Sequence, residues 1–143
     1  DNVNKGTAIY QWLDEHLDWS RYEFTFVGRS PVVFKNIHMI PAVDSYRMAE
    51  LFRAHDIYLT ASRNDPCSNS LIEALNCRLP AVYLRSGGHP EIVKQAGAGF
   101  ESAEEIPGLL NQVSDAYEAF QSHISMPSIE KVSEEYLKVL ELL

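Results

Sequence analysis

The feature that most constrains the fold of this chain is a repeated alternation of short apolar strands with amphipathic helices. Between residues 6 and 93, stretches with helical periodicity are separated from extended apolar stretches by a few polar, Gly or Pro residues. Short connections in this order are typical of a parallel sheet with helices on both of its faces. The sequence therefore predicts an α/β fold.

Turn residues and hydrophobic periodicity place the individual elements. Strands are predicted at Tyr22–Val27, Asn36–Ile40, Ile57–Ala61 and Ala81–Leu84. Helices are predicted to begin near Thr7, at Asp44 or Ser45, after Ser68 and at Pro90. We interpret Gly97 and Gly99 as the end of the helix that begins at Pro90.

The last part of the chain, residues 104–143, has a helical pattern only. Apolar residues recur there at spacings of three and four in two stretches, which predicts two long amphipathic helices. The first contains Leu109, Leu110, Val113, Tyr117, Phe120 and Ile124, and the second contains Ile129, Val132, Tyr136, Val139 and Leu143. With only about three heptads in total, helices that pack on the domain are favoured over a coiled coil.

Length and charge limit the classes of protein that fit. The 143 residues suit one domain, residues 1–143, and 12 basic against 20 acidic residues give a net charge of −8, which argues against a nucleic-acid partner. The sequence has no stretch of about 18 apolar residues, so no membrane-spanning helix is predicted. Cys67 and Cys77 lack a disulfide or zinc spacing, which favours reduced thiols and a cytoplasmic location. Because the sequence begins at Asp1 without an initiator Met, we expect it to be part of a longer chain.

Ligands of parallel sheets bind outside the carboxyl ends of the strands, so the loops after predicted strands are the candidate sites. These loops are Gly28–Pro31, Ser62–Ser68 and Arg85–His89. In the second loop Asp65 lies eight residues before Glu73, which is in the first turn of a predicted helix. Free amides at a helix start favour an anion, while carboxylates can accept hydrogen bonds from sugar hydroxyls. This combination indicates a site for a nucleotide sugar.

A purely structural interpretation of the same residues is also open. Ser70 and Glu73 have the spacing of a capping box, in which the Glu73 carboxylate accepts a hydrogen bond from the Ser70 amide. Helix-capping preferences alone favour this interpretation. Asp65, directly before Pro66, is equally suited to a turn.

The segment that contains Asp65 and Glu73, residues 56–93, resembles the donor-binding half of retaining glycosyltransferases with the two-domain GT-B fold, in particular group 1, also called family 4. The motifs that support the resemblance are Asp65 with Glu73, the turn Cys77-Arg78-Leu79-Pro80 and the loop Gly87-Gly88-His89-Pro90-Glu91. In order, the resemblance extends from Asn4-Lys5-Gly6 to Gly97. It implies a Rossmann-like domain, the C-terminal half of the GT-B fold, with a first strand that precedes this sequence.

The resemblance also implies roles for individual residues. Of the two acidic residues, which we treat as the catalytic pair, Glu73 would bind the nucleotide ribose and Asp65 would contact the donor sugar. The amides of Asn69, Ser70 and Leu71 and the side chain of Lys5 would hold the diphosphate, with an Arg partner of Lys5 located before Asp1. Further donor contacts are expected from Gly28, Arg29, Gly87, Gly88 and His89.

No cofactor and no metal ion is expected, because the sequence has no Asp-x-Asp motif and Lys5 with the helix amides would balance the diphosphate charge. Three residues depart from the family pattern. Asp65 is one methylene shorter than the usual Glu, Ser68 replaces Gly or Pro, and Arg78 replaces Gly. If Arg78 adopts a left-handed backbone, the cost is roughly 1 kcal/mol.

The function favoured by these expectations is donor binding in a transferase of the hexosyltransferase type. It would pass a sugar from a nucleoside-diphosphate sugar to an acceptor held by a separate N-terminal domain. Residues 1–143 alone are then expected to be inactive, and any association with the cytoplasmic face of a membrane would depend on the other half. Two alternatives stay open: half of a nucleotide-sugar 2-epimerase, and a non-catalytic nucleotide-binding or interaction module of the same fold.

Overall fold

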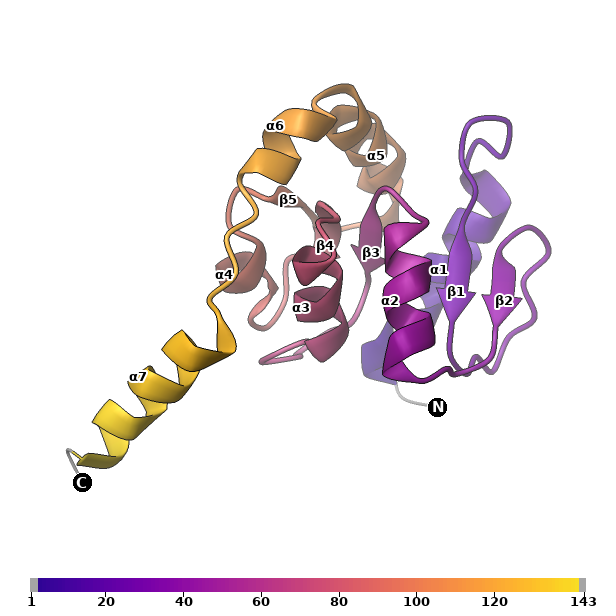
Figure 1. The fold of residues 1–143 in the computed structure, drawn as a ribbon. Helices are drawn as coiled ribbons and strands as arrows, with labels where there is room; N and C mark the ends of the chain where they lie inside the picture. Colours follow the sequence, from indigo (N-terminus) through magenta and orange to yellow (C-terminus); the bar gives the residue numbers. More distant parts are fainter. Residues whose placement is uncertain (1–2, 142–143) are drawn as a thin grey trace.

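A computed structural model describes residues 3–141 as parallel strands in two sheets that are flanked by helices (Figure 1). One sheet pairs β1 (Thr25–Val27) with β2 (His38–Ile40). The other has the order β3 (Tyr58–Thr60), β4 (Ala81–Leu84), β5 (Gly97–Phe100). The predicted α/β class and the parallel pairing are confirmed, but the strands form two sheets in place of one.

Helices cover both faces of these sheets (Figure 1). On one face lie α1 (Thr7–His16) and α5 (Ile106–Asp115), and on the other lie α2 (Ser45–Arg53), α3 (Asn69–Asn76) and α4 (His89–Val93). The short helices η1 (Val3–Lys5) and η2 (Ala103–Glu105) precede α1 and α5.

The core is divided by the central strand β4, all four residues of which are buried. Val82 and Leu84 pack toward α1 and α5, in a cluster that includes Leu13, Phe100 and Ile106. Ala81 and Tyr83 pack toward the opposite face, in a cluster with Leu71 and Leu75 of α3 and Val93 of α4. A strand that is buried on both faces has a continuous apolar sequence. The bounds of β4 are therefore the same in the sequence-based prediction and in the structure.

Gly97 and Gly99 form part of strand β5 and do not end a helix as predicted. A Cβ atom on Gly97 would lie 2.0 Å from the carbonyl oxygen of Ala81, so only glycine permits this approach of β5 to β4. Glycine is unfavourable inside most strands and marks close backbone contact where it occurs. The prediction failed here because the close contact between β5 and β4 outweighs the low preference of glycine for strands.

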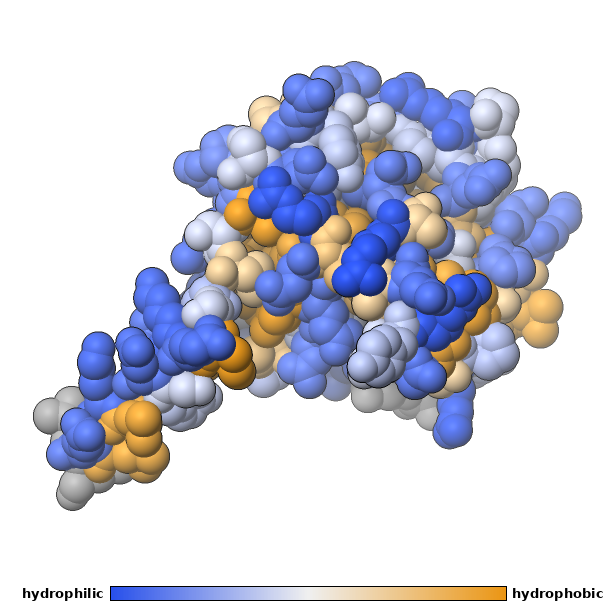
Figure 2. Space-filling view, in the orientation of Figure 1, coloured by the Kyte–Doolittle hydropathy of each residue, from blue (hydrophilic) through white to orange (hydrophobic). Residues whose placement is uncertain are grey.

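The C-terminal helical part differs from the two long packed helices that were predicted. The first of these is split at Ala116, where ψ is 31°, into α5 and α6 (Tyr117–Ser122). The second is α7 (Ile129–Glu141), which extends away from the body of the domain (Figure 1). Most of its apolar residues are exposed to solvent (Figure 2), as in Ile129 and Tyr136, which are 72% and 71% exposed. Leu143, assigned to the same helix, lies outside the described residues.

Three other local signals at helix ends were interpreted correctly. The Asp44 side chain accepts a hydrogen bond of 2.9 Å from the Arg47 amide and caps α2. Pro90 lies in the first turn of α4. Arg78, just after α3, has a φ of 72°, so the left-handed backbone suspected from the family pattern is present with a non-glycine residue. This conformation costs about 1 kcal/mol.

The long connection between β1 and β2 is held against α1 by one buried carboxylate. Asp14, 7% exposed, accepts hydrogen bonds from the backbone amides of Lys35, Asn36 and Ile37 at 2.7 to 2.8 Å. Burial of Asp14 acts to raise the pKa of its carboxyl, but these three amides outweigh it and the net pKa is lowered. The carboxylate therefore contributes stability only while it is ionised.

We expect Asp14→Asn to lower the free energy of unfolding by about 2 kcal/mol near pH 7, because an amide group offers one acceptor oxygen and turns a donor toward backbone N–H groups. The lowered pKa means that the contribution is present above the unfolded-state value of about 3.9 and is lost as pH falls through the folded-state value. Denaturant titrations between pH 7 and pH 3 should show the two proteins converging in acid. Asp18→Asn, in an exposed turn, is the control and should change stability far less. Equal effects of the two substitutions would contradict the anchoring role.

Candidate functional site

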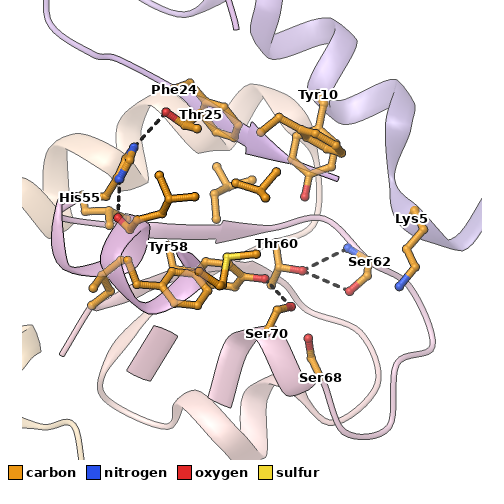
Figure 3. Close-up of a pocket in the computed structure, with 18 of the residues that line it drawn as sticks. Lys5, Tyr10, Phe24, Thr25, His55, Tyr58, Thr60, Ser62, Ser68 and Ser70 are labelled. Carbon is orange, nitrogen blue, oxygen red and sulfur yellow. Dashed lines mark hydrogen bonds between the residues drawn. The ribbon is translucent and has the colours of Figure 1, made fainter. Parts of the chain in front are cut away.

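A cavity of about 380 Å³ lies between β1 and β3 and opens at their carboxyl ends (Figure 3). Its walls come from both strands, from α2, and from the loops that follow β1 and β3. Four of the residues predicted for the site line it: Lys5, Arg29, Asp65 and Ser70. The structure thus brings two cations, a carboxylate and the start of α3 to one opening, at the edge of the sheet where ligands of parallel α/β folds bind.

The start of α3 faces this opening with free backbone amides. Ser68 is the N-cap residue and its side chain makes no capping hydrogen bond. The Ile72 amide donates to the Ser68 carbonyl at 3.1 Å, whereas the amides of Asn69, Ser70 and Leu71 have no acceptor among residues 3–141. The side chain of Leu71 is fully buried, so only its backbone is available to a ligand. Unpaired amides at a helix start form a site of positive partial charge.

The capping box that the sequence suggested for Ser70 and Glu73 is not formed. Since α3 begins at Asn69, the third helical residue is Leu71, and Glu73 lies too far along the helix to reach the N-cap amide. The Ser70 hydroxyl instead makes a 2.8 Å hydrogen bond with Tyr58 Oη (Figure 3). Glu73 is exposed, and its carboxylate has no hydrogen bond or ion pair within residues 3–141. Its carboxylate is therefore not occupied by a structural role.

Both predicted acidic residues lie close enough to Tyr58 to affect the pKa of its phenol. Burial raises the pKa of Tyr58, and the carboxylates of Glu73 and Asp65 raise it further, against the lowering effect of the hydrogen bonds to Ser70 and Thr60. The phenol accordingly stays protonated at neutral pH. Two carboxylates and a neutral phenol beside free helix amides make a site that can accept hydrogen bonds from hydroxyl groups and bind an anion.

Gly87 and Gly88 position the loop that contains Asp65. The Gly88 amide donates to the Asp65 carbonyl oxygen at 2.9 Å. A Cβ atom on Gly87, whose φ is +59°, would lie 2.2 Å from the same oxygen. In the loop itself, the Asp65 side chain accepts a hydrogen bond of 3.3 Å from the Cys67 amide. The two glycines therefore lie directly behind Asp65 and do not themselves line the cavity.

His89 is fully buried and lies behind the cavity wall. Its Nδ1 lies 2.9 Å from the Leu84 carbonyl oxygen, which can only accept, so this nitrogen carries the proton. Nε2 then accepts a hydrogen bond from the Ser62 hydroxyl at 3.3 Å, and Ser62 Oγ lies 3.1 Å from Thr60 Oγ1. His89 thus touches the lining residue Ser62. Gly28, which donates to the Ile40 carbonyl at 2.9 Å, is also outside the lining.

Several lining residues were not singled out in the sequence. Ser62 was recognised only as the end of a loop, Ser68 as the other end of that loop and as a departure from the family pattern, and Tyr58 and Thr60 only as strand residues. The alternation of β3 contains the signal for the last two: Tyr58 and Thr60 share one face of the strand, and both are polar at their tips. Tyr10, in the helix predicted to begin near Thr7, was not named as a site residue; its hydroxyl accepts a hydrogen bond of 3.1 Å from the Ala61 amide at the cavity wall.

Two further classes of feature do not occur in residues 3–141. No group of three or more His, Cys, Asp or Glu side chains is arranged to hold a metal ion. No helix in that range has the length and apolar character needed to span a membrane.

Comparison with known proteins identifies relatives at the level of family and of fold. Residues 10–124 match the family model of the group 1 glycosyl transferases. Sucrose-phosphate synthase from Thermosynechococcus elongatus superimposes with a TM-score of 0.66 at 14% identity, over 99% of this chain and 44% of that one. The C-terminal domain of a group 1 family glycosyl transferase from Francisella tularensis gives 0.52 at 22% identity, over 71% and 54%. The comparison with curated proteins gave no match.

Both structural neighbours support the Rossmann-like architecture of a GT-B C-terminal domain. This chain spans about half the length of each of the two solved chains.

We expect Gly87→Ala to destabilise the domain by more than about 2 kcal/mol, because the added methyl group meets backbone atoms of Asp65 at a positive φ. Gly108→Ala is the matched control: a Cβ atom there meets nothing within 4 Å, and the change should stabilise α5 by about 0.5 to 1 kcal/mol. Thermal unfolding of the two variants measures both effects. A Gly87→Ala protein as stable as the parent would show that the contact with the Asp65 loop is not a constraint.

Proposed function

The chain belongs to the group 1 glycosyl transferases, and we propose that it binds the nucleoside-diphosphate sugar donor at the carboxyl ends of β1 and β3. The observation that carries the proposal is the opening of the α3 start onto the same cavity as Lys5 and Arg29. Free amides and two cations suit a diphosphate, and a fixed set of donors binds it without reorganisation.

The diphosphate would bind between the α3 amides and the cationic side chains. Lys5 and Arg29 are both exposed and both line the cavity: Lys5 ends η1, and Arg29 follows β1. A charge-assisted hydrogen bond to a phosphate oxygen is about twice as strong as a neutral one. Local positive charge of this kind can hold an anion on a protein whose net charge is −8.

The sugar parts of the donor would contact the two carboxylates. Glu73, one turn into α3, has no competing partner among the described residues and is assigned to the ribose hydroxyls. Asp65 lines the cavity and is assigned to the transferred sugar. Because Asp65 is held at its backbone by Gly88, its position relative to α3 is fixed before the donor arrives.

In the proposed reaction the bond between the anomeric carbon of the sugar and the diphosphate oxygen breaks, and a bond forms to an acceptor hydroxyl oxygen, which loses its proton. The anomeric configuration is retained. The α3 amides and Lys5 stabilise the charge on the departing nucleoside diphosphate. The acceptor and the opposite wall of the cleft would come from a separate N-terminal domain in the cytoplasm. Residues 1–143 alone would therefore bind the donor weakly and transfer no sugar.

We expect Glu73→Gln to weaken binding of a nucleoside diphosphate about tenfold or more, since one charged acceptor of two ribose hydroxyls is lost. Its melting temperature should stay close to that of the parent, because Glu73 makes no capping contact. Isothermal titration with UDP, GDP and ADP, together with thermal unfolding, measures both quantities. Glu118→Gln, on the exposed surface of α6, is the control and should change neither. Unchanged affinity in Glu73→Gln would remove Glu73 from the site.

We expect the nucleoside diphosphate to bind with the same affinity, within a few-fold, in EDTA and in Mg²⁺. The donor set proposed for the diphosphate consists of amides, Lys5 and Arg29, none of which is a ligand for Mg²⁺. The parallel titration would use a single nucleotide at constant ionic strength, so that screening does not differ between the two buffers. A strict requirement for the metal would contradict the proposed donor set.

A further inference from the structure

A chain of hydroxyl groups connects the buried ring of His89 with the first turn of α3. Ser62 Oγ lies 3.3 Å from Nε2 of the ring and 3.1 Å from Thr60 Oγ1. At the other end, Tyr58 Oη lies 2.8 Å from Ser70 Oγ (Figure 3). The Tyr58 phenol also makes a side-chain hydrogen bond with Thr60, which joins the two parts. The chain therefore runs from behind the cavity wall to Ser70, which lines the cavity.

The direction in which these groups donate is set at His89. The ring is fully buried and its two hydrogen-bond partners carry no charge, so it is neutral and has one N–H group. This N–H is on Nδ1, because the partner of Nδ1 at 2.9 Å is the Leu84 carbonyl oxygen, which can only accept. Nε2 is therefore an acceptor, and the Ser62 hydroxyl donates to it.

Each hydroxyl group has a single hydrogen, so the direction set at the ring is passed along the chain. The hydrogen of Ser62 points to His89, and Thr60 must therefore donate to Ser62. Thr60 can then only accept from Tyr58, and Tyr58 can only accept from Ser70. Within residues 3–141 no buried side-chain nitrogen or oxygen lacks a hydrogen-bond partner, and this single arrangement satisfies every link of the chain.

Ser70 is the exposed end of the chain, and its oxygen is left as an acceptor. Its only hydroxyl hydrogen points inward to Tyr58, so lone pairs of the oxygen face the opening. Phosphate oxygens are acceptors as well, and two acceptors do not form a hydrogen bond. A hydroxyl group of a ligand, in contrast, can donate to this oxygen. The side chain of Ser70 is therefore suited to a sugar, whereas its backbone amide is suited to the diphosphate.

The neighbour of Ser70 on the helix surface indicates which sugar this is. Glu73 follows Ser70 by three residues in α3, and side chains at this spacing share one face of a helix. Both residues act on the Tyr58 phenol, Ser70 through its hydrogen bond and Glu73 through its charge. Glu73 is the residue assigned above to the ribose hydroxyls. Ser70 thus adds a second acceptor on the side of α3 where the ribose would bind.

We propose that Ser70 is a specificity-determining residue of the donor site, whose oxygen accepts a hydrogen bond from one ribose hydroxyl beside Glu73, and that His89 positions it for this through the hydroxyl chain. The inference rests on the proposed function, because it places the ribose at α3. It adds that the site prefers a ribonucleotide to a deoxy analogue and that part of this preference comes from a neutral side chain. His89 acts through the chain and does not touch the ligand.

The first test measures binding by isothermal titration with whichever of UDP, GDP and ADP binds most tightly, and with the 2′-deoxy and 3′-deoxy analogues of that nucleotide. We expect Ser70→Ala to weaken the ribonucleotide about threefold or more, since one neutral hydrogen bond is lost. The analogue that lacks the accepted hydroxyl should bind to Ser70→Ala and to the parent equally. Ser70→Thr keeps the hydroxyl group and should bind all three nucleotides like the parent. Ser133→Ala, an exposed serine of α7, is the matched control.

The outcomes separate this proposal from the proposed function. An equal loss of affinity for all three nucleotides in Ser70→Ala would show that the hydroxyl acts on the phosphates or on the fold, and would overturn the proposal. Unchanged affinity for the ribonucleotide would overturn it as well. A parent protein that binds the ribonucleotide and both analogues equally would overturn this proposal alone. A parent that binds no nucleoside diphosphate would overturn the proposed function, and this proposal with it.

The second test examines the direction of the chain without a ligand. Long-range ¹H–¹⁵N correlation spectra show which ring nitrogen of His89 carries the proton. We expect a proton on Nδ1 and none on Nε2 near neutral pH. Ser62→Ala should shift the Nε2 resonance, because that nitrogen loses its donor, while Nδ1 stays protonated. A proton on Nε2 of the parent would reverse the chain and overturn the proposal, a result that a purely structural role of His89 would not predict either way.

Discussion

The close contact between the backbone of Gly87 and that of Asp65 is the constraint on which the candidate site depends. The two loops follow neighbouring strands, β3 and β4, and at this point they are too close for any side chain larger than hydrogen. The contact fixes where Asp65 lies, and the Asp65 loop leads directly into Ser68 and the start of α3. His89, one residue beyond the glycine pair, holds Ser62 at the other end of the same loop. One backbone contact thus orders the loop at its middle, and a buried histidine orders it at its beginning.

An acidic protein can bind a diphosphate only if its charges are arranged locally. The net charge is −8, yet the opening at the carboxyl ends of β1 and β3 is flanked by Lys5 and Arg29 and faces the unpaired amides of α3. The two carboxylates, Asp65 and Glu73, are neighbours of Tyr58, whose phenol stays protonated beside them. Cationic side chains and the Asp65 carboxylate therefore lie at one opening, and Glu73 lies near Tyr58, which lines it. This arrangement is the basis of the proposed nucleotide-sugar site.

The sequence predicted those features that depend on local chemistry and missed those that depend on the neighbours of a segment. β4, the cap at Asp44 and the left-handed position of Arg78 follow from patterns within a few residues. Strand β5 was missed because Gly97 is required by its contact with Ala81, which lies sixteen residues away in the sequence. The Ser70 and Glu73 capping box was wrong because its spacing is compatible with two helix starts, and only the position of Ser68 decides between them.

The apolar face of α7 predicts packing, but no described element lies against it. Four of the predicted site residues line one cavity, namely Lys5, Arg29, Asp65 and Ser70, whereas Gly28, Gly87, Gly88 and His89 lie outside its lining.

The central claim, that a nucleoside diphosphate binds at the start of α3, is tested most directly by mapping backbone amide chemical shifts during titration with UDP, GDP or ADP. The account predicts that the largest changes occur at Asn69, Ser70 and Leu71, with smaller changes near Lys5 and Arg29. Changes centred instead on the separate cavity that is lined by Trp19 and Tyr117 would contradict it.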